Sequence, residues 1–196
     1  MKRMTRRAQG FSLLELVVVL AIMLIVFSMS IIGVQAALRS YRASGDATAL
    51  TEVLSLTRMR AAESNTHARL NCSLTTSFCQ VEILNRTTNS YQNDTSAYSL
   101  SSGSSFNLDG IGAPPNGTQN ALSQASPCLD NGGVNIGNTA CIVFNSRGIP
   151  IDATTLAPTR SDALYLANGT NSLAVTLSPT GAVSLWQNSQ GSWKAY

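Results

Sequence analysis

A single carboxylate, that of Glu15, stands at the start of the longest apolar stretch of the chain. The stretch from Leu16 to Leu38 contains 23 residues without a charged side chain, which is enough for a helix that crosses a bilayer. A carboxylate at the edge of hydrocarbon is costly unless it meets a group of opposite charge. The type and position of Glu15 therefore indicate ion-pair chemistry at an apolar boundary, and neighbouring elements must hold this group in place.

Two ordinary interpretations of this region compete with a special role for Glu15. Basic residues, an apolar core and the small residues at Val34–Ala36 also describe a cleaved secretory signal, although the apolar stretch is long for one. A plain membrane anchor fits the length. Neither interpretation explains the Gly10–Phe11 junction with a glutamate shortly after it. Basic residues before the stretch outnumber those after it, which predicts a cytoplasmic N-terminus; they are Lys2, Arg3, Arg6 and Arg7, against Arg39 and Arg42.

The segment from Gly10 to Ile22, GFSLLELVVVLAI, resembles the class III signal of type IV pilins and pseudopilins. This resemblance implies that a prepilin peptidase cuts between Gly10 and Phe11 on the cytoplasmic side and methylates the new amine of Phe11. It also makes Glu15 the fifth residue of the mature chain. The motif is contiguous and specific, and it covers only the first part of the chain.

The charges at this junction explain why such a motif is useful. After cleavage, the positive amine of Phe11 and the negative Glu15 both lie near the edge of the apolar phase. When subunits stack into a filament, Glu15 of one subunit can neutralise the amine of a neighbour. Breaking such a pair is costly because it leaves a lone buried charge. We therefore expect Glu15 to fix the register of assembly.

Length and charge limit what the remainder can do. The 196 residues suffice for one domain and an anchor. Removing residues 1–10 leaves 9 basic against 10 acidic side chains, and beyond Arg42 the count is 7 against 9. The exported domain is therefore not basic, which disfavours a broad electrostatic face for nucleic acid.

The four cysteines, Cys72, Cys79, Cys128 and Cys141, all follow the membrane segment. An even number in an exported domain indicates disulfides, for which three connectivities are possible. We favour Cys72–Cys79 and Cys128–Cys141, because each pair brackets a turn-rich stretch inside a candidate hairpin. A zinc site is the alternative, but the spacings do not fit and His67 is the only histidine.

Helical patterning runs from about Ser12 to about Asn65. After the membrane part, apolar residues at spacings near three and four predict a stripe that packs under a globular head. Charged residues, Asp46 among them, occupy the other positions of the helix. The predicted stripe consists of Leu38, Tyr41, Leu50, Val53, Leu54, Thr57 and Ala61.

From Thr66 onward, short alternating runs separated by turn residues are typical of β strands. The stretch 109–137 contains three prolines and predicts a long loop. The fold class that follows is α+β, with a long N-terminal helix packed on an antiparallel sheet. The predicted strands are 68–72, 79–84, 98–100, 105–108, 140–144, 163–166, 173–177, 182–186 and 192–194.

The expected domain organisation follows from the motif and these elements. It comprises a cleaved leader (1–10), a transmembrane or filament-core half of the helix (11–38), an amphipathic half of the helix (39–65) and a periplasmic β-rich head (66–196).

The head resembles one branch of the same superfamily, the FimT/FimU-like minor pilins and minor pseudopilin H. Three segments carry this resemblance: Arg58–Ala62, Ile142–Gly148 and Leu177–Val183. Some members of this branch bind DNA through an arginine-rich C-terminal segment. Here, only Lys194 is basic beyond Gly181, so DNA binding is not favoured. The candidate DNA contacts that remain are Arg147, Arg160 and Lys194.

Other chemistry has little support. With one histidine, no nucleophile and base can be assembled by spacing, so we expect neither an enzyme nor a cofactor. Oxygen ligands at Asp130–Gly133 could hold calcium, but the same residues are more often a turn, and no metal is predicted. Trp186, Trp193 and Tyr196 could form an exposed contact patch, but their spacing favours packing on the sheet.

Three functions remain compatible with the sequence. The leading hypothesis is a minor type IV pilin, which initiates pilus assembly and contributes to the filament tip. The alternatives are a minor pseudopilin of a type II secretion system and a DNA-binding minor pilin for natural transformation. The resemblance implies a location in the bacterial inner membrane and then in the pilus or pseudopilus. The implied partners are prepilin peptidase, other pilins or pseudopilins, the inner-membrane assembly platform and the lipid bilayer.

Overall fold

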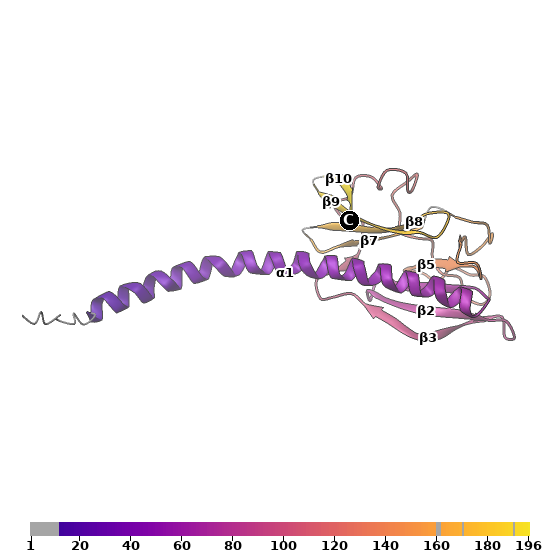
Figure 1. Cartoon of the computed structure of the whole chain (residues 1–196), viewed down its shortest axis with the longest axis horizontal. Helices are drawn as coiled ribbons and strands as arrows, with labels where there is room; N and C mark the ends of the chain where they lie inside the picture. The colour runs from indigo at the N-terminus through magenta and orange to yellow at the C-terminus, as the bar shows by residue number, and fades with distance from the viewer. Residues whose placement is uncertain (1–11, 160–161, 170, 190) are drawn as a thin grey trace, which may run out of the picture. The chain divides into compact units, whose positions relative to one another are not determined.

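The described residues form one long helix and ten strands (Figure 1). The computed structural model describes residues 12–159, 162–169, 171–189 and 191–196. The helix α1 spans Leu13–Glu63. This arrangement confirms the predicted α+β class, with the difference that the strands form two antiparallel sheets instead of one. The strands are β1 (Ala68–Ser73), β2 (Phe78–Asn85), β3 (Ser90–Ser99), β4 (Ser105–Phe106), β5 (Thr139–Phe144), β6 (Pro150–Ile151), β7 (Ala163–Ala167), β8 (Ser172–Leu177), β9 (Val183–Ser189) and β10 (Ser192–Ala195).

The chain divides into two compact units, up to Leu38 and from Arg39 onward, and α1 contributes to both. In the first unit, the Ser12 hydroxyl accepts a hydrogen bond from the Leu14 amide at 3.3 Å and so caps the helix. The large apolar side chains between Leu13 and Phe27 are 44–82% exposed. By length and composition, this helix can cross a membrane.

The second unit is the head, in which the two sheets each have five strands. The first sheet has the order β3-β2-β1-β5-β6, and the second has the order β10-β9-β8-β7-β4. All named strand pairs are antiparallel. Three strands differ most from the prediction: β6 was not expected, β4 is shorter than the predicted strand at 105–108, and β3 is much longer than the predicted strand at 98–100. The polar residues of β3 leave little apolar alternation, so its pairing with β2 decides its structure.

The main core lies where the second half of α1 meets both sheets. Small and aliphatic residues of α1 share one apolar cluster with β1 and β2 of the first sheet and with β7 and β8 of the second. Each fully buried aliphatic side chain contributes about 1.5–3 kcal/mol relative to an exposed one. The α1 members, all at most 1% exposed, are Ala43, Ala47, Leu50, Leu54 and Ala61.

Three assignments on this helix were wrong. Leu38 was predicted on the packed stripe, but its side chain is 47% exposed, and it belongs to the first compact unit. Tyr41 was placed on the packed stripe, but its side chain is 80% exposed. It precedes Ala43 by two residues, which is about 200° around the helix, so it points away from the core. Asp46 was placed on the polar face, but it is 1% exposed because it lies on the same face as Ala43 and Ala47. The alanines define the packed face, since their small side chains let the sheets approach the helix.

Candidate functional site

Glu15 lies in the first turn of α1, and its side chain is exposed. In the described part of the chain, its carboxylate forms no ion pair. The first turn of a helix is a favourable position for a negative charge, because free backbone amides point toward it. The carboxylate is thus held at the start of an exposed apolar helix and is available to a cation from outside the subunit.

The predicted processing residues, Gly10 and Phe11, lie outside the described residues. The cut between them and the methylation of Phe11 therefore stay predictions. The described chain begins with Ser12, whose backbone carbonyl accepts from the Leu16 amide at 3.2 Å.

The structure brings together the three head segments that resemble the minor pilin branch. Arg58, near the C-terminal end of α1, donates from Nη1 to the carbonyl oxygen of Gly181 at 3.2 Å. Gly148 lies in the turn after β5 and Gly181 in the turn before β9, both with positive φ (+71° and +79°). A Cβ on Gly148 would lie 2.7 Å from Arg58 Nε, and one on Gly181 would lie 2.5 Å from the Gly148 carbonyl oxygen. These turns need glycine for both backbone conformation and space.

The predicted cysteine pairs are the pairs that the structure forms. Cys72–Cys79 joins directly opposed residues of the β1–β2 hairpin. Cys128–Cys141 ties the long loop after β4 to β5. Both disulfides involve strands of the first sheet. A disulfide stabilises mainly by restricting the unfolded chain, by about 2–4 kcal/mol.

The two candidate DNA contacts within the described residues, Arg147 and Lys194, do not form one site. Arg147 is exposed beside the C-terminal part of α1, in a groove that Ser55 and Ala62 also line. Lys194 is in β10, whose following residue Tyr196 donates to Ser44 at 3.5 Å. Ser44 and Ser55 are 11 residues apart on α1, or about 16 Å along it. Arg160 lies outside the described residues.

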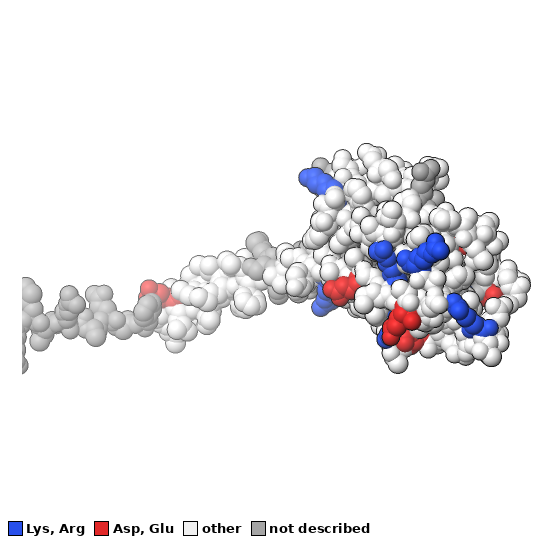
Figure 2. All heavy atoms as spheres, turned by 45° about the vertical axis from the view of Figure 1, so that its right-hand side comes forward, with Lys and Arg blue, Asp and Glu red and all other residues white. Residues whose placement is uncertain are grey.

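The distribution of charged side chains on the surface agrees with the separation of Arg147 from Lys194. On the face shown in Figure 2, the lysines and arginines form separate groups, and acidic side chains lie beside some of them. Among the described residues, Arg60 pairs with both Glu63 and Asp94, and Arg69 pairs with Glu82. The glutamate hydrogen bond and these nearby carboxylates raise the pKa of Arg60.

Asp46 is a structural site that the sequence did not reveal. Its Oδ1 accepts hydrogen bonds from the Tyr98 hydroxyl (2.7 Å), the Ser101 amide (3.1 Å) and the Ser101 hydroxyl (2.7 Å). Burial, with the hydrogen bond to Asp46, raises the pKa of the Tyr98 hydroxyl. Asp46 thereby joins α1 to the end of β3. Its position between Ala43 and Ala47 is the signal that could have identified it as buried.

Two other groups of residues that the sequence offered as candidate sites, 130–133 and the C-terminal aromatic residues, make contacts within the head. Asp130 Oδ1 accepts from the amides of Gly132 and Val134, both at 2.8 Å, as in a turn. Trp186 and Trp193 are half-buried and pack against a second apolar cluster around Tyr165, whereas Tyr196 is 70% exposed. The Trp193 indole donates to the Ala113 carbonyl at 2.7 Å, which attaches the long loop to β10.

Comparisons with known proteins bear on both units. Residues 5–31 match the family described as "Prokaryotic N-terminal methylation motif". No curated protein matches the chain. Among solved structures, the chain is similar to the minor pseudopilin EpsH from the type 2 secretion system of Vibrio cholerae. The identity is 14% and the TM-score 0.46, over 74% of this chain and 95% of that chain.

The chain therefore carries the N-terminal methylation motif of prepilin-type leaders. Its described residues form an α+β fold, with one long N-terminal helix and two antiparallel sheets. This match agrees with the resemblance of the segment Gly10–Ile22 to the class III signal of type IV pilins and pseudopilins.

Proposed function

We propose that this chain is a minor type IV pilin, a structural subunit that helps to initiate pilus assembly and belongs to the filament tip complex. The observation that carries this proposal is the methylation motif at residues 5–31, which overlaps the first part of α1, where the apolar side chains are exposed. A soluble domain would bury such side chains, whereas a lipid phase or the core of a filament covers them.

Glu15 supplies the assembly step in this proposal. Prepilin peptidase removes residues 1–10 and leaves a methylated, positively charged amine on Phe11. In the bilayer, that amine and Glu15 are both costly near hydrocarbon. In the filament, the carboxylate of one subunit neutralises the amine of its neighbour, so assembly replaces two lone charges by a pair. The exposed position of Glu15 in the first turn of α1 supports this role.

The proposed location follows from the same segment. Residues 11–38 span the inner membrane with the N-terminus in the cytoplasm, as the basic residues before the apolar stretch favour. Residues 39–65 contain the amphipathic half of α1, and residues 66–196 form the β-rich part of the head in the periplasm. An oxidising periplasm suits a head with two disulfides. The expected partners are other pilins and the inner-membrane assembly platform.

Replacing Glu15 tests this function. We expect Glu15→Ala to leave membrane insertion and leader cleavage intact and to abolish incorporation into the filament. The matched control is Glu52→Ala, which removes another exposed carboxylate from the same helix. Immunoblots of the membrane fraction and of sheared filaments measure both steps. Normal incorporation of the Glu15 variant would refute the assembly role.

A minor pseudopilin of a type II secretion system is the second candidate. The three head segments that converge at Arg58 are shared by FimT/FimU-like pilins and minor pseudopilin H, so they favour both candidates. Deleting the gene separates them. Loss of surface filaments with intact exoprotein secretion supports the pilin, and the opposite result supports the pseudopilin. A DNA-binding role predicts a gel shift with the full-length chain in detergent at low salt.

A further inference from the structure

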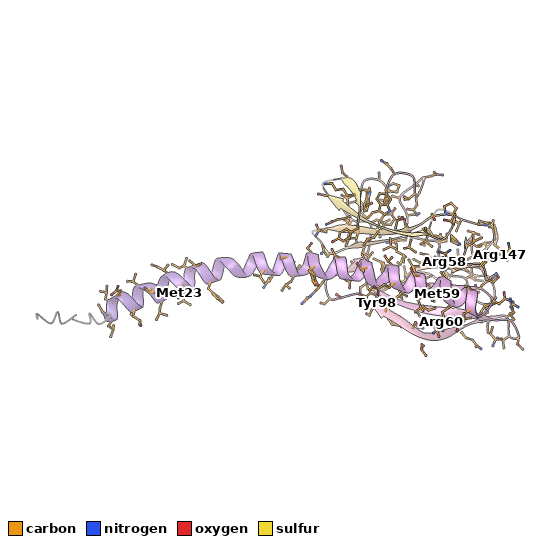
Figure 3. The ribbon with its side chains drawn as sticks, in the orientation of Figure 1. Met23, Arg58, Met59, Arg60, Tyr98 and Arg147 are labelled. Atoms are coloured by element: carbon orange, nitrogen blue, oxygen red, sulfur yellow. A yellow bond between two sulfur atoms is a disulfide. The ribbon has the colours of Figure 1, made fainter. Side chains whose placement is uncertain are left out.

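A groove of about 370 Å³ lies beside the C-terminal part of α1 and the turn after β5. We call it the Arg58–Arg147 groove. Figure 3 shows both arginines at the same end of the head, with Met59 close to Arg58. The residues that line it are Ser55, Arg58, Met59, Ala62, Arg147 and Gly148.

The two arginines of this groove have no acidic partner among the described residues. Neither forms an ion pair with any described residue, whereas their neighbour Arg60 pairs with two carboxylates. Arg58 donates to a backbone carbonyl, that of Gly181, and Arg147 is exposed. The groove therefore presents two positive charges whose guanidinium groups are suited to a carboxylate.

The groove also offers an apolar contact. Met59 is 66% exposed, which makes it one of the largest apolar surfaces at this end of α1. The flexible thioether of methionine adapts to differently shaped partners, and exposed methionine is common at binding surfaces. Ala62, one turn further along α1, is exposed as well. A matching ligand would combine an acidic group with an adjoining apolar side chain.

Arg58 is held in position before any ligand arrives. The turns at Gly148 and Gly181 press against its side chain so closely that a Cβ on Gly148 would lie 2.8 Å from Arg58 Cγ. A side chain that is already ordered loses less conformational entropy on binding. The two glycines thus serve the groove as well as the turns.

We propose that the Arg58–Arg147 groove binds an acidic side chain, flanked by apolar residues, on a neighbouring filament subunit. This inference rests on the proposed function, because a filament supplies such neighbours. A protein fits better than nucleic acid for two reasons. The groove has two basic residues and apolar walls, and the chain beyond Arg42 has more acidic than basic residues. A protein surface that binds nucleic acid instead places many Lys and Arg side chains along the phosphate backbone.

Site-specific photo-crosslinking in cells that assemble the full-length chain tests this proposal. A benzophenone amino acid replaces Met59, and the crosslinked peptides in sheared filaments are identified by mass spectrometry. We expect a filament-subunit peptide that contains Asp or Glu. Arg147→Glu should reduce this crosslink about tenfold or more, as expected when one charge of an interfacial pair is reversed. Arg147→Lys should retain most of it, and reversing the acidic residue of the partner should restore it.

The same probe at Leu156, an exposed apolar residue outside the groove, is the matched control and should be insensitive to Arg147→Glu. The proposal is overturned if the Met59 probe captures no filament subunit, captures nucleic acid, or is unaffected by Arg147→Glu. In these cases incorporation of the wild-type chain into filaments still stands. If the wild-type chain itself is absent from filaments, the proposed function fails, and this inference fails with it.

Discussion

The two halves of α1 have the same secondary structure and opposite surroundings. From Leu13 to Phe27 the large apolar side chains are exposed, while from Ala43 to Ala61 the packed face is fully buried in the head. The first half has aliphatic side chains all around the helix, as lipid or a filament core requires. The second half has a stripe with alanines, as close packing on sheets requires. A continuous helix can thus serve two different apolar environments when only its side chains change.

Each half also contains one carboxylate in apolar surroundings, and the two carboxylates find partners differently. Asp46 receives three hydrogen bonds from Tyr98 and Ser101 of its own chain. Glu15 is exposed and has no ion-pair partner among the described residues. Hydrogen bonds to Oδ1 of Asp46 join α1 to the end of β3, whereas the open carboxylate of Glu15 is available for assembly.

The largest effect expected in the head is that of a core truncation in the second half. Leu54→Ala should lower the free energy of unfolding of the head by about 2–5 kcal/mol, because it leaves a cavity at a fully buried position. Leu20→Ala, in the exposed first half, should leave it unchanged. Urea unfolding in detergent, followed by tryptophan fluorescence, measures both variants. Equal effects would show that the two halves are not energetically distinct.

The buried carboxyl group of Asp162 makes the stability of the head sensitive to pH. Burial, with the nearby charge of Asp152, raises the pKa of Asp162 to about 7. Since the unfolded chain releases this proton near pH 4, the stability of the head should fall as the pH rises from about 4 to about 7. The full loss is on the order of 4 kcal/mol.

Asp162→Asn tests this pH dependence. The variant should be more stable than wild type at pH 8, and the difference should shrink toward pH 4. Urea unfolding at a series of pH values provides the measurement. A constant difference between the two proteins across this range would contradict the assignment.

Removing the Asp46 carboxylate sharpens the contrast with Glu15. Asp46→Ala should destabilise the head by about 1–3 kcal/mol, because the Tyr98 hydroxyl and the Ser101 amide lose their acceptor. The double variant with Tyr98→Phe should cost less than the sum of the two single changes, since both remove the same hydrogen bond. Thermal unfolding of the full-length chain in detergent measures the coupling. Additive effects would show that the hydrogen bond contributes little.

The smallest effect is expected at Tyr41, which the sequence placed on the packed stripe. Tyr41→Ser should change the free energy of unfolding by less than about 0.5 kcal/mol, because the side chain is 80% exposed. Urea unfolding of the variant beside Leu54→Ala makes the comparison direct. A large loss would mean that the ring contributes to the packed face.

The sequence was sufficient for the elements whose signal is local. The end of α1 near Glu63, most strands and the methylation motif follow from periodicity, turn residues and the Gly10–Glu15 segment. The division into two sheets could not be predicted in this way, because strand order depends on contacts far apart in the sequence. The burial of Asp46 and the exposure of Tyr41 were missed for a related reason. Residue type suggested the opposite of what the alanine face of α1 imposes.

The convergence at Arg58 shows what sequence motifs alone leave open. Three separate segments were recognised, but their contact was not. It depends on two positive-φ turns meeting one side chain across the head, and only the tertiary structure provides that information.

The disulfides have a mechanical consequence. Both join residues between Cys72 and Cys141, so neither one fastens α1 covalently to the sheets. Tension applied through the N-terminal half of α1 would be borne by side-chain packing in shear. The hydrogen bonds from Asn168 to the Arg39 carbonyl and from Asn171 to Ser40 would share it. Under force, the cross-linked hairpin would hold its length while the helix slides against it. The packing of the alanine face against the sheets, and not a covalent bond, would set the force at which the helix separates from the sheets.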